Sequence, residues 1–118
     1  MRHDDDVTVL DVLLAARKSV EFLGDLDLPA FLEDEKTQAA VLHQLLVVGE
    51  AVKRLSDEFR SARPDVPWKK IAGMRDVLIH AYDAVDIESV YATMKRDLPD
   101  LIDRLRASEP DAAKSGRN

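Results

Sequence analysis

The sequence predicts an all-α fold, an up-and-down bundle of four main helices with a kink or break in the third or fourth. Four segments repeat their apolar residues at helical spacing, and none alternates apolar and polar residues as a strand does. Only four Gly and five Pro interrupt a chain of 118 residues, of which 46% are hydrophobic and 34% charged. Short connections between such amphipathic helices favour antiparallel packing in one domain.

The first two predicted helices carry regular apolar stripes. The acidic run at residues 4–6 suits the N-cap and first turn of a helix that stops at Gly24. The second helix is predicted to begin within residues 34–37 and to end before Pro64. Its apolar seam repeats at offsets of four and three residues: Val41, Leu45, Val48, Val52, Leu55 and Phe59. A seam of this length could serve a partner helix as well as its own core, which favours a homodimer.

The third and fourth predicted helices both contain irregular positions. The third covers residues 67–82, begins at a proline and has a candidate break near Gly73. The fourth has Asp86 as its N-cap. Pro99 lies inside this fourth helix and lacks the N–H needed for a helical hydrogen bond, so we predict a kink or restart near Asp97.

The bulk composition limits the class of protein. The predicted helical domain spans residues 1–108, and the polar residues 109–118 form a tail predicted to be disordered. The chain has no cysteine, which excludes disulfides, cysteine-ligated zinc and a thiol nucleophile. No apolar run approaches the ~18 residues of a membrane span, and the acidic N-terminus is unlike a signal peptide. We expect a cytoplasmic protein that does not contact membranes.

The charge is unevenly distributed. A net charge of −6 argues against general nucleic-acid binding, which depends on neutralising phosphates. The window from Lys53 to Arg75 nevertheless holds seven basic and three acidic residues. Such a patch could hold one RNA segment. The alternative is a solvated helix end whose cations interact with the helix dipole, and charge alone favours this alternative.

Residues 67–82 carry the candidate chemistry. On an ideal helix, Val77 and Leu78 lie in an apolar arc, Arg75 and Tyr82 lie nearly in line at one border, and His80 lies about 140° from Arg75. One straight helix therefore cannot easily direct both Arg75 and His80 at the same phosphate. Either the helix bends, or two copies of the chain combine two arginines and two histidines around one groove.

These residue types suit cleavage of RNA, which supplies its own nucleophile, the 2′-hydroxyl. Histidine titrates near neutral pH and can act as acid or base, and a guanidinium can stabilise the developing phosphate charge. Asp76, four residues before His80, could orient the imidazole. This chemistry requires no metal ion or other cofactor. From spacing alone, surface or capping roles for Arg75 and His80, and a core role for Tyr82, remain the more common interpretation.

Several short motifs follow one another in a consistent order. They are Gly49-Glu50-Ala51, Pro67-Trp68, an Arg75–His80–Tyr82 set with four and then one intervening residues, and Asp97-Leu98-Pro99. Over roughly residues 5–106, their order and spacing resemble the HepT-like family of the HEPN superfamily.

The resemblance implies a HEPN helical bundle that acts as a homodimer, with a metal-independent endoribonuclease site in the dimer groove. The protein would be the toxin of a toxin–antitoxin pair. Arg75 and His80 match the family's catalytic pair, with Asp76 at a position where Asn is common. Tyr82 matches the residue to which a minimal nucleotidyltransferase antitoxin attaches AMP from ATP, silencing the toxin. Glu50 matches a family position too.

Some roles stay open at this point. Glu50 is either a buried polar partner of Arg75 or His80, or a charge on the helix surface, while Gly49 allows close helix packing. Lys69 and Lys70 are candidates for RNA binding. One competing function is a non-catalytic dimer that binds a nucleotidyltransferase and serves as its substrate. Another is a nucleotide-binding regulatory module that uses Arg75, Lys69 and Lys70. A four-helix-bundle metal enzyme fits poorly, because its paired Glu-x-x-His motifs are missing.

Overall fold

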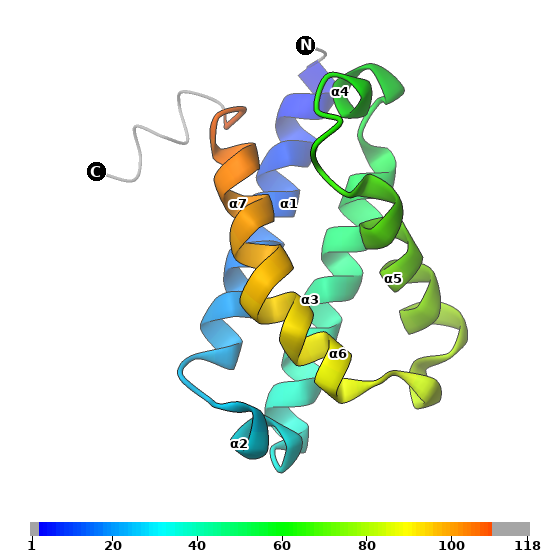
Figure 1. Ribbon diagram of the computed structural model, residues 1–118. Coiled ribbons are helices and arrows are strands. Elements are labelled where there is room, and N and C mark those ends of the chain that lie inside the picture. Colours follow the sequence, from blue (N-terminus) through cyan, green and yellow to red (C-terminus); the bar gives the residue numbers. More distant parts are fainter. Residues whose placement is uncertain (1–2, 110–118) are drawn as a thin grey trace.

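The computed structural model describes residues 3–109, and all regular secondary structure within them is helical. Four long parts run up and down the bundle: α1 (His3–Leu23), α3 (Glu35–Arg54), α5 (Trp68–His80) and a continuous run of α6 (Ile87–Ala92), η2 (Thr93–Asp97) and α7 (Leu98–Arg106). Helix α3 packs against α1 and against α5, and α7 returns along α1 (Figure 1). The predicted all-α bundle is confirmed. No helix within the described range is long and apolar enough to cross a membrane.

The described chain reaches just into the predicted tail. Glu109 is buried, and its carboxylate accepts a hydrogen bond of 3.4 Å from the Arg17 guanidinium on α1. Residues 110–118, which make up the rest of the predicted tail, lie outside the described residues, as do residues 1 and 2.

The apolar seam predicted for the second helix lies in the core of the chain itself. All six residues of the predicted seam are at most 2% exposed: Val41, Leu45, Val48, Val52, Leu55 and Phe59. Neighbouring helices of the same chain, chiefly α1 and α5, cover it. The seam therefore offers no free surface to a partner helix, and a dimer would have to form on another face.

The second predicted helix is interrupted, which the periodicity did not reveal. Helix α3 ends at Arg54 and is followed by the short α4 (Asp57–Ser61), whose N-cap Ser56 accepts a hydrogen bond from the Phe59 N–H. The buried Asp5 carboxylate on α1 accepts hydrogen bonds from the Ser56 N–H (2.9 Å) and hydroxyl (2.6 Å). The helix ends before Pro64, as predicted, but the prediction that one helix carries the whole seam to Phe59 was wrong, since Phe59 lies on α4.

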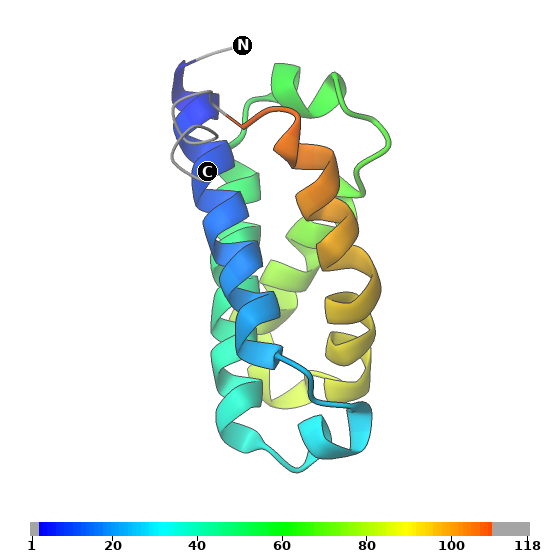
Figure 2. The ribbon, with the colours of Figure 1, turned by 90° about the vertical axis from the view of Figure 1, so that its left-hand side faces the viewer.

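A short helix that we did not predict closes the lower end of the bundle. Helix α2 (Leu28–Leu32) is capped by Asp27, which accepts a hydrogen bond from the Ala30 N–H at 3.0 Å. It lies beyond the end of α1, below the long helices (Figures 1 and 2). Five residues are too few to show a helical period, so this helix is visible in the sequence only through its cap and Pro29.

The last helical run confirms both of its predicted signals. Asp86 caps α6 by accepting a hydrogen bond from the Glu88 N–H at 3.0 Å. The irregularity predicted near Asp97 is present as the π-helical segment η2, after which Pro99 stands in the first turn of α7. Pro99 has no N–H and cannot donate a helical hydrogen bond to the preceding turn. The preceding turn is a wider π turn, and the helical run continues through it without a sharp break.

Candidate active site

The helix that carries the candidate residues is unbroken and firmly anchored at its start. Helix α5 is unbroken from Trp68 to His80, so the break considered near Gly73 does not occur. The Trp68 indole N–H points at the backbone carbonyls of Arg60 and Arg63, both at 3.0 Å, and the ring packs edge-on against Phe59. Trp68 is therefore a packing anchor that fixes where α5 begins.

Arg75 lies where α5 comes closest to α3. A Cβ atom built on Gly49 would stand 2.3 Å from the Cβ of Arg75, so only glycine fits beneath this side chain. The guanidinium then reaches Glu50, the next residue of α3, with its Nε 2.6 Å from Glu50 Oε1. Glu50 is thus a partner of Arg75, but a half-exposed rather than a buried one.

Two further charges complete a network across the two helices, which we call the α3–α5 charge cluster: Glu50, Lys53, Arg75 and Asp76. Arg75 Nη1 lies 2.9 Å from Asp76 Oδ1, and Lys53 Nζ lies 3.3 Å from the same oxygen. Hydrogen bonds to Glu50 and then Asp76 raise the pKa of Arg75. Hydrogen bonds from Arg75 and then Lys53 lower the pKa of Asp76. Arg75 and Asp76 therefore both stay charged near neutral pH.

The cluster differs from the sequence expectation in two ways. The Asp76 carboxylate is engaged by Arg75 and Lys53, and no hydrogen bond joins it to His80 within the described chain, so it does not orient the imidazole here. Sequence reasoning also missed Lys53 as a member of the site. The sequence did contain a signal for Lys53. It stands three residues after Glu50, so both side chains lie on one face of the helix.

His80 stands apart from this cluster. It is the exposed last residue of α5, about 140° around the axis and roughly 7.5 Å along it from Arg75. A single unbroken helix thus separates the two candidate catalytic residues, as the helical angle predicted. The geometry leaves His80 accessible from a direction that Arg75 does not face.

Tyr82 is not in helical register with Arg75, contrary to expectation. The helix ends at His80 because the backbone of Ala81 leaves it (φ −144°, ψ 45°), and Tyr82 begins the short 3₁₀ turn η1 (Tyr82–Ala84). Its side chain is 53% exposed, which excludes a core role in the single chain. The expected apolar arc is also divided, since Leu78 is buried while Val77 is 47% exposed.

The basic window is largely neutralised by ion pairs. Five of its seven cations are paired with carboxylates. Lys70 Nζ lies 2.6 Å from Asp97 Oδ2 and bridges α5 to η2, whereas Lys69 is exposed and makes no ion pair within the described residues.

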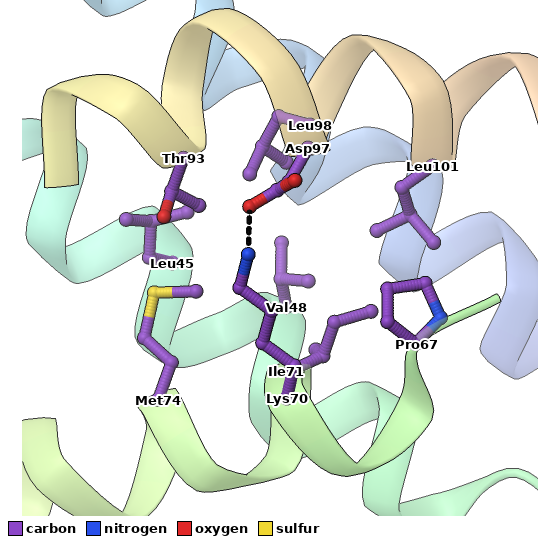
Figure 3. Close-up of a pocket in the computed structure, with 10 residues that line it drawn as sticks. All are labelled: Leu45, Val48, Pro67, Lys70, Ile71, Met74, Thr93, Asp97, Leu98 and Leu101. Atoms are coloured by element: carbon purple, nitrogen blue, oxygen red, sulfur yellow. Dashed lines mark hydrogen bonds and ion pairs between the residues drawn. The ribbon is translucent and has the colours of Figure 1, made fainter. Parts of the chain in front are cut away.

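The Lys70–Asp97 bridge spans a small apolar hollow between α5 and the α6–α7 run (Figure 3). The hollow has a floor from α3 and walls from the two flanking elements: Leu45, Val48, Pro67, Ile71, Met74, Leu98 and Leu101. The charge of Lys70 is therefore paired with that of Asp97 across the hollow.

The sequence from the middle of α1 to the end of α7 matches a known family. The family model described as Ribonuclease HepT-like covers residues 12–108. The chain belongs to the HepT-like ribonuclease family. The matched range includes all four members of the charge cluster as well as His80 and Tyr82. The resemblance drawn from the motifs is therefore confirmed.

Curated relatives agree with the HepT-like assignment. The "Probable ribonuclease HepT" of Thermococcus cleftensis is 41% identical over 91 residues, which cover 77% of this chain and 83% of the relative. A "Putative RNase" of Methanocaldococcus jannaschii is 38% identical over 101 residues, or 86% of this chain and 84% of the relative. Another, from Caldanaerobacter subterraneus, is 39% identical over 82 residues, covering 70% and 73%. No solved structure is significantly similar to this HepT-like chain.

Proposed function

We propose that this HepT-like protein is a metal-independent endoribonuclease that cleaves RNA through the 2′-hydroxyl, and that it is the toxin of a toxin–antitoxin pair. The observation that carries the proposal is the placement of Arg75 and His80 on α5. The arginine is held against α3 by Glu50 at 2.6 Å, and the histidine is exposed at the end of the same helix. Relatives that carry ribonuclease names support this reaction class.

The proposed reaction is a transesterification. A base removes the proton of the 2′-hydroxyl, whose oxygen forms a bond to phosphorus while the bond from phosphorus to the 5′-oxygen breaks. An acid donates a proton to the departing 5′-oxygen, which leaves a 2′,3′-cyclic phosphate and a 5′-hydroxyl end. His80 supplies the acid–base group, and Arg75 stabilises the charge that develops on the phosphate oxygens. Glu50 acts through Arg75, by fixing the direction of its guanidinium.

The separation of Arg75 and His80 on one helix favours a site built from two copies of the chain. Val77 and Ile79, on either side of the buried Leu78, are 47% and 42% exposed. Exposed large apolar side chains of this kind can contribute to a surface that another protein covers. In the proposed homodimer, the C-terminal end of α5 lies beside the two-fold axis, so that both copies contribute to one groove.

Lys69 and Lys70 would extend this groove to neighbouring phosphates of the RNA. Lys69 stands exposed in the first turn of α5 and needs no rearrangement to meet a phosphate. Lys70 Nζ lies 2.6 Å from Asp97 Oδ2, so a phosphate would have to share this ammonium with the carboxylate or displace it.

The decisive experiment is digestion of bulk cellular RNA by the purified, unmodified protein in the presence of EDTA. We expect cleavage, with 2′,3′-cyclic phosphate and 5′-hydroxyl ends. Intact-mass measurement must first show that Tyr82 carries no AMP. RNA that stays intact under these conditions would contradict the proposal and favour the non-catalytic binding subunit.

The proposed silencing acts on Tyr82. Its phenol oxygen would attack the α-phosphorus of ATP on a minimal nucleotidyltransferase antitoxin, forming an O–P bond and releasing pyrophosphate and the phenol proton. The side chain is exposed enough to be reached, and it lies two residues from His80. An attached AMP would bring bulk and negative charge to the place where RNA binds.

Replacing Tyr82 by phenylalanine should give a ribonuclease that the nucleotidyltransferase and ATP no longer silence. The readouts are the AMP mass on the intact protein and residual RNA cleavage. Tyr91→Phe is the matched control, because the Tyr91 hydroxyl donates a 3.0 Å hydrogen bond to the Leu26 carbonyl and its ring packs on Phe31. This control should still be modified and silenced. Full modification of Tyr82→Phe would exclude Tyr82 as the acceptor.

A further inference from the structure

The α3–α5 charge cluster directs two cations at one carboxylate oxygen. Arg75 Nη1 and Lys53 Nζ lie 2.9 Å and 3.3 Å from Asp76 Oδ1. A non-bridging phosphate oxygen carries comparable charge and accepts the same hydrogen bonds, and both arginine and lysine bind phosphates in proteins. The arrangement thus resembles a phosphate site in which the protein supplies the anion.

The carboxylate is well placed to be exchanged for a phosphate. The side chains of Lys53 and Asp76 are 43% and 50% exposed, and ion pairs between such exposed groups are individually weak. Arg75 is less exposed, at 21%, and its Nε stays bound to Glu50 when Asp76 moves. Its Nη2 makes no hydrogen bond among residues 3–109. Displacement of Asp76 would therefore present a fixed guanidinium edge and a nearby ammonium to the same anion.

We infer that Lys53 binds the RNA phosphate together with Arg75, and that Asp76 occupies the position of this phosphate in the free protein. The inference rests on the proposed ribonuclease function and adds a substrate-binding residue from α3. Asp76 is then not a catalytic group but a competitor of the substrate. Its carboxylate holds the two cations together in the free protein and competes with the RNA phosphate for them.

Opposite effects on RNA affinity distinguish this role from a merely structural one. Lys53→Ala removes a phosphate contact and should weaken RNA binding. Asp76→Asn removes the competing charge and leaves both cations in place, so it should strengthen RNA binding. If the cluster only stabilised the packing of α5 on α3, both substitutions would act in the same direction.

The test is binding of a single-stranded 2′-O-methyl RNA oligonucleotide, which lacks the nucleophile and cannot be cleaved by this chemistry. Fluorescence anisotropy at several salt concentrations gives the affinity and its salt dependence. Lys53→Ala should bind severalfold more weakly, with a slope of log K against log salt reduced by about 0.7, the value for one contact to single-stranded nucleic acid. Lys53→Arg should retain most of the affinity, and Asp76→Asn should bind more tightly than wild type.

Arg54→Ala is the matched control, because Arg54 is the adjacent cation but pairs with Asp11 on α1 at 3.3 Å. It should leave affinity and slope unchanged. The inference is overturned if Lys53→Ala binds like Arg54→Ala, or if Asp76→Asn weakens binding as Lys53→Ala does. Cleavage of unmodified RNA by wild type, measured in parallel, separates the two proposals. If wild type cleaves RNA and Lys53→Ala binds RNA as wild type does, only the proposed role of Lys53 is excluded. If wild type neither cleaves nor binds RNA, the ribonuclease function and the role of Lys53 are both excluded.

Discussion

Replacing His80 by alanine is expected to reduce RNA cleavage about 100- to 10,000-fold, the range that one general acid–base group contributes. The loss should appear in the rate of the bound complex, because His80 is proposed to act on protons rather than to hold the RNA. The measurement is single-turnover cleavage of a defined RNA at saturating protein. Since His80 is exposed at the end of α5, the thermal unfolding temperature should stay close to that of wild type.

His43→Ala is the control for this substitution, because His43 is also exposed but lies on α3, outside the charge cluster. It should cleave RNA at the wild-type rate. Arg75→Ala should also lose cleavage, and Arg75→Lys should restore little, because an ammonium cannot keep the 2.6 Å contact to Glu50 and still present a planar fork. Equal cleavage by His80→Ala and His43→Ala would exclude His80 from the chemistry.

The parts of the fold that were predicted correctly depend on local signals. Gly24, with its φ of 58°, ends α1, and Asp34 caps α3 by accepting a hydrogen bond from the Thr37 N–H at 3.0 Å. These positions need only neighbours within a few residues, so the sequence displays them directly. The α3 seam is equally visible, since its period reflects one buried face.

Several of the parts that were missed involve contacts between distant residues. The turn after α3 includes a contact to Asp5, 51 residues before the Ser56 that it binds. The partners of Asp76 depend on how α5 is rotated against α3, which brings Lys53 rather than His80 to its carboxylate. Tyr82 lost its expected register because the helix stopped two residues earlier. Helix ends and side-chain partners of this kind follow from packing, which no periodicity reports.

The sequence predicted that Gly49 allows close helix packing, and the structure confirms this and shows that Arg75 is the residue packed against it. The glycine has no Cβ, and the Cβ of Arg75 takes that space when α5 packs on α3. The close approach of the two helices also determines the distance from Arg75 to Glu50 and the distance from Asp76 to Lys53. The geometry of the whole charge cluster therefore depends on one missing methyl group.

Gly49→Ala should consequently destabilise the protein by about 1–3 kcal/mol, the usual cost of overpacking a well-packed contact. The added Cβ would stand 2.3 Å from the Arg75 Cβ and 3.3 Å from its Cα, and neither atom belongs to the flexible end of the side chain. Relief requires α5 to move away from α3, which would also lengthen the contact from Arg75 to Glu50. We expect a lower thermal unfolding temperature and a loss of RNA cleavage that persists at temperatures where the variant is fully folded.

The matched control is Gly73→Ala, the same substitution at the glycine within α5. Nothing lies within 4 Å of a Cβ built on Gly73, and the residue is in the middle of a regular helix. Alanine there should stabilise the protein by roughly 0.5–1 kcal/mol, because it restricts the unfolded chain and favours the helix. The two substitutions should thus change stability in opposite directions. A Gly49→Ala protein as stable and as active as Gly73→Ala would mean that α3 and α5 are not so closely packed, and that Arg75 is held in some other way.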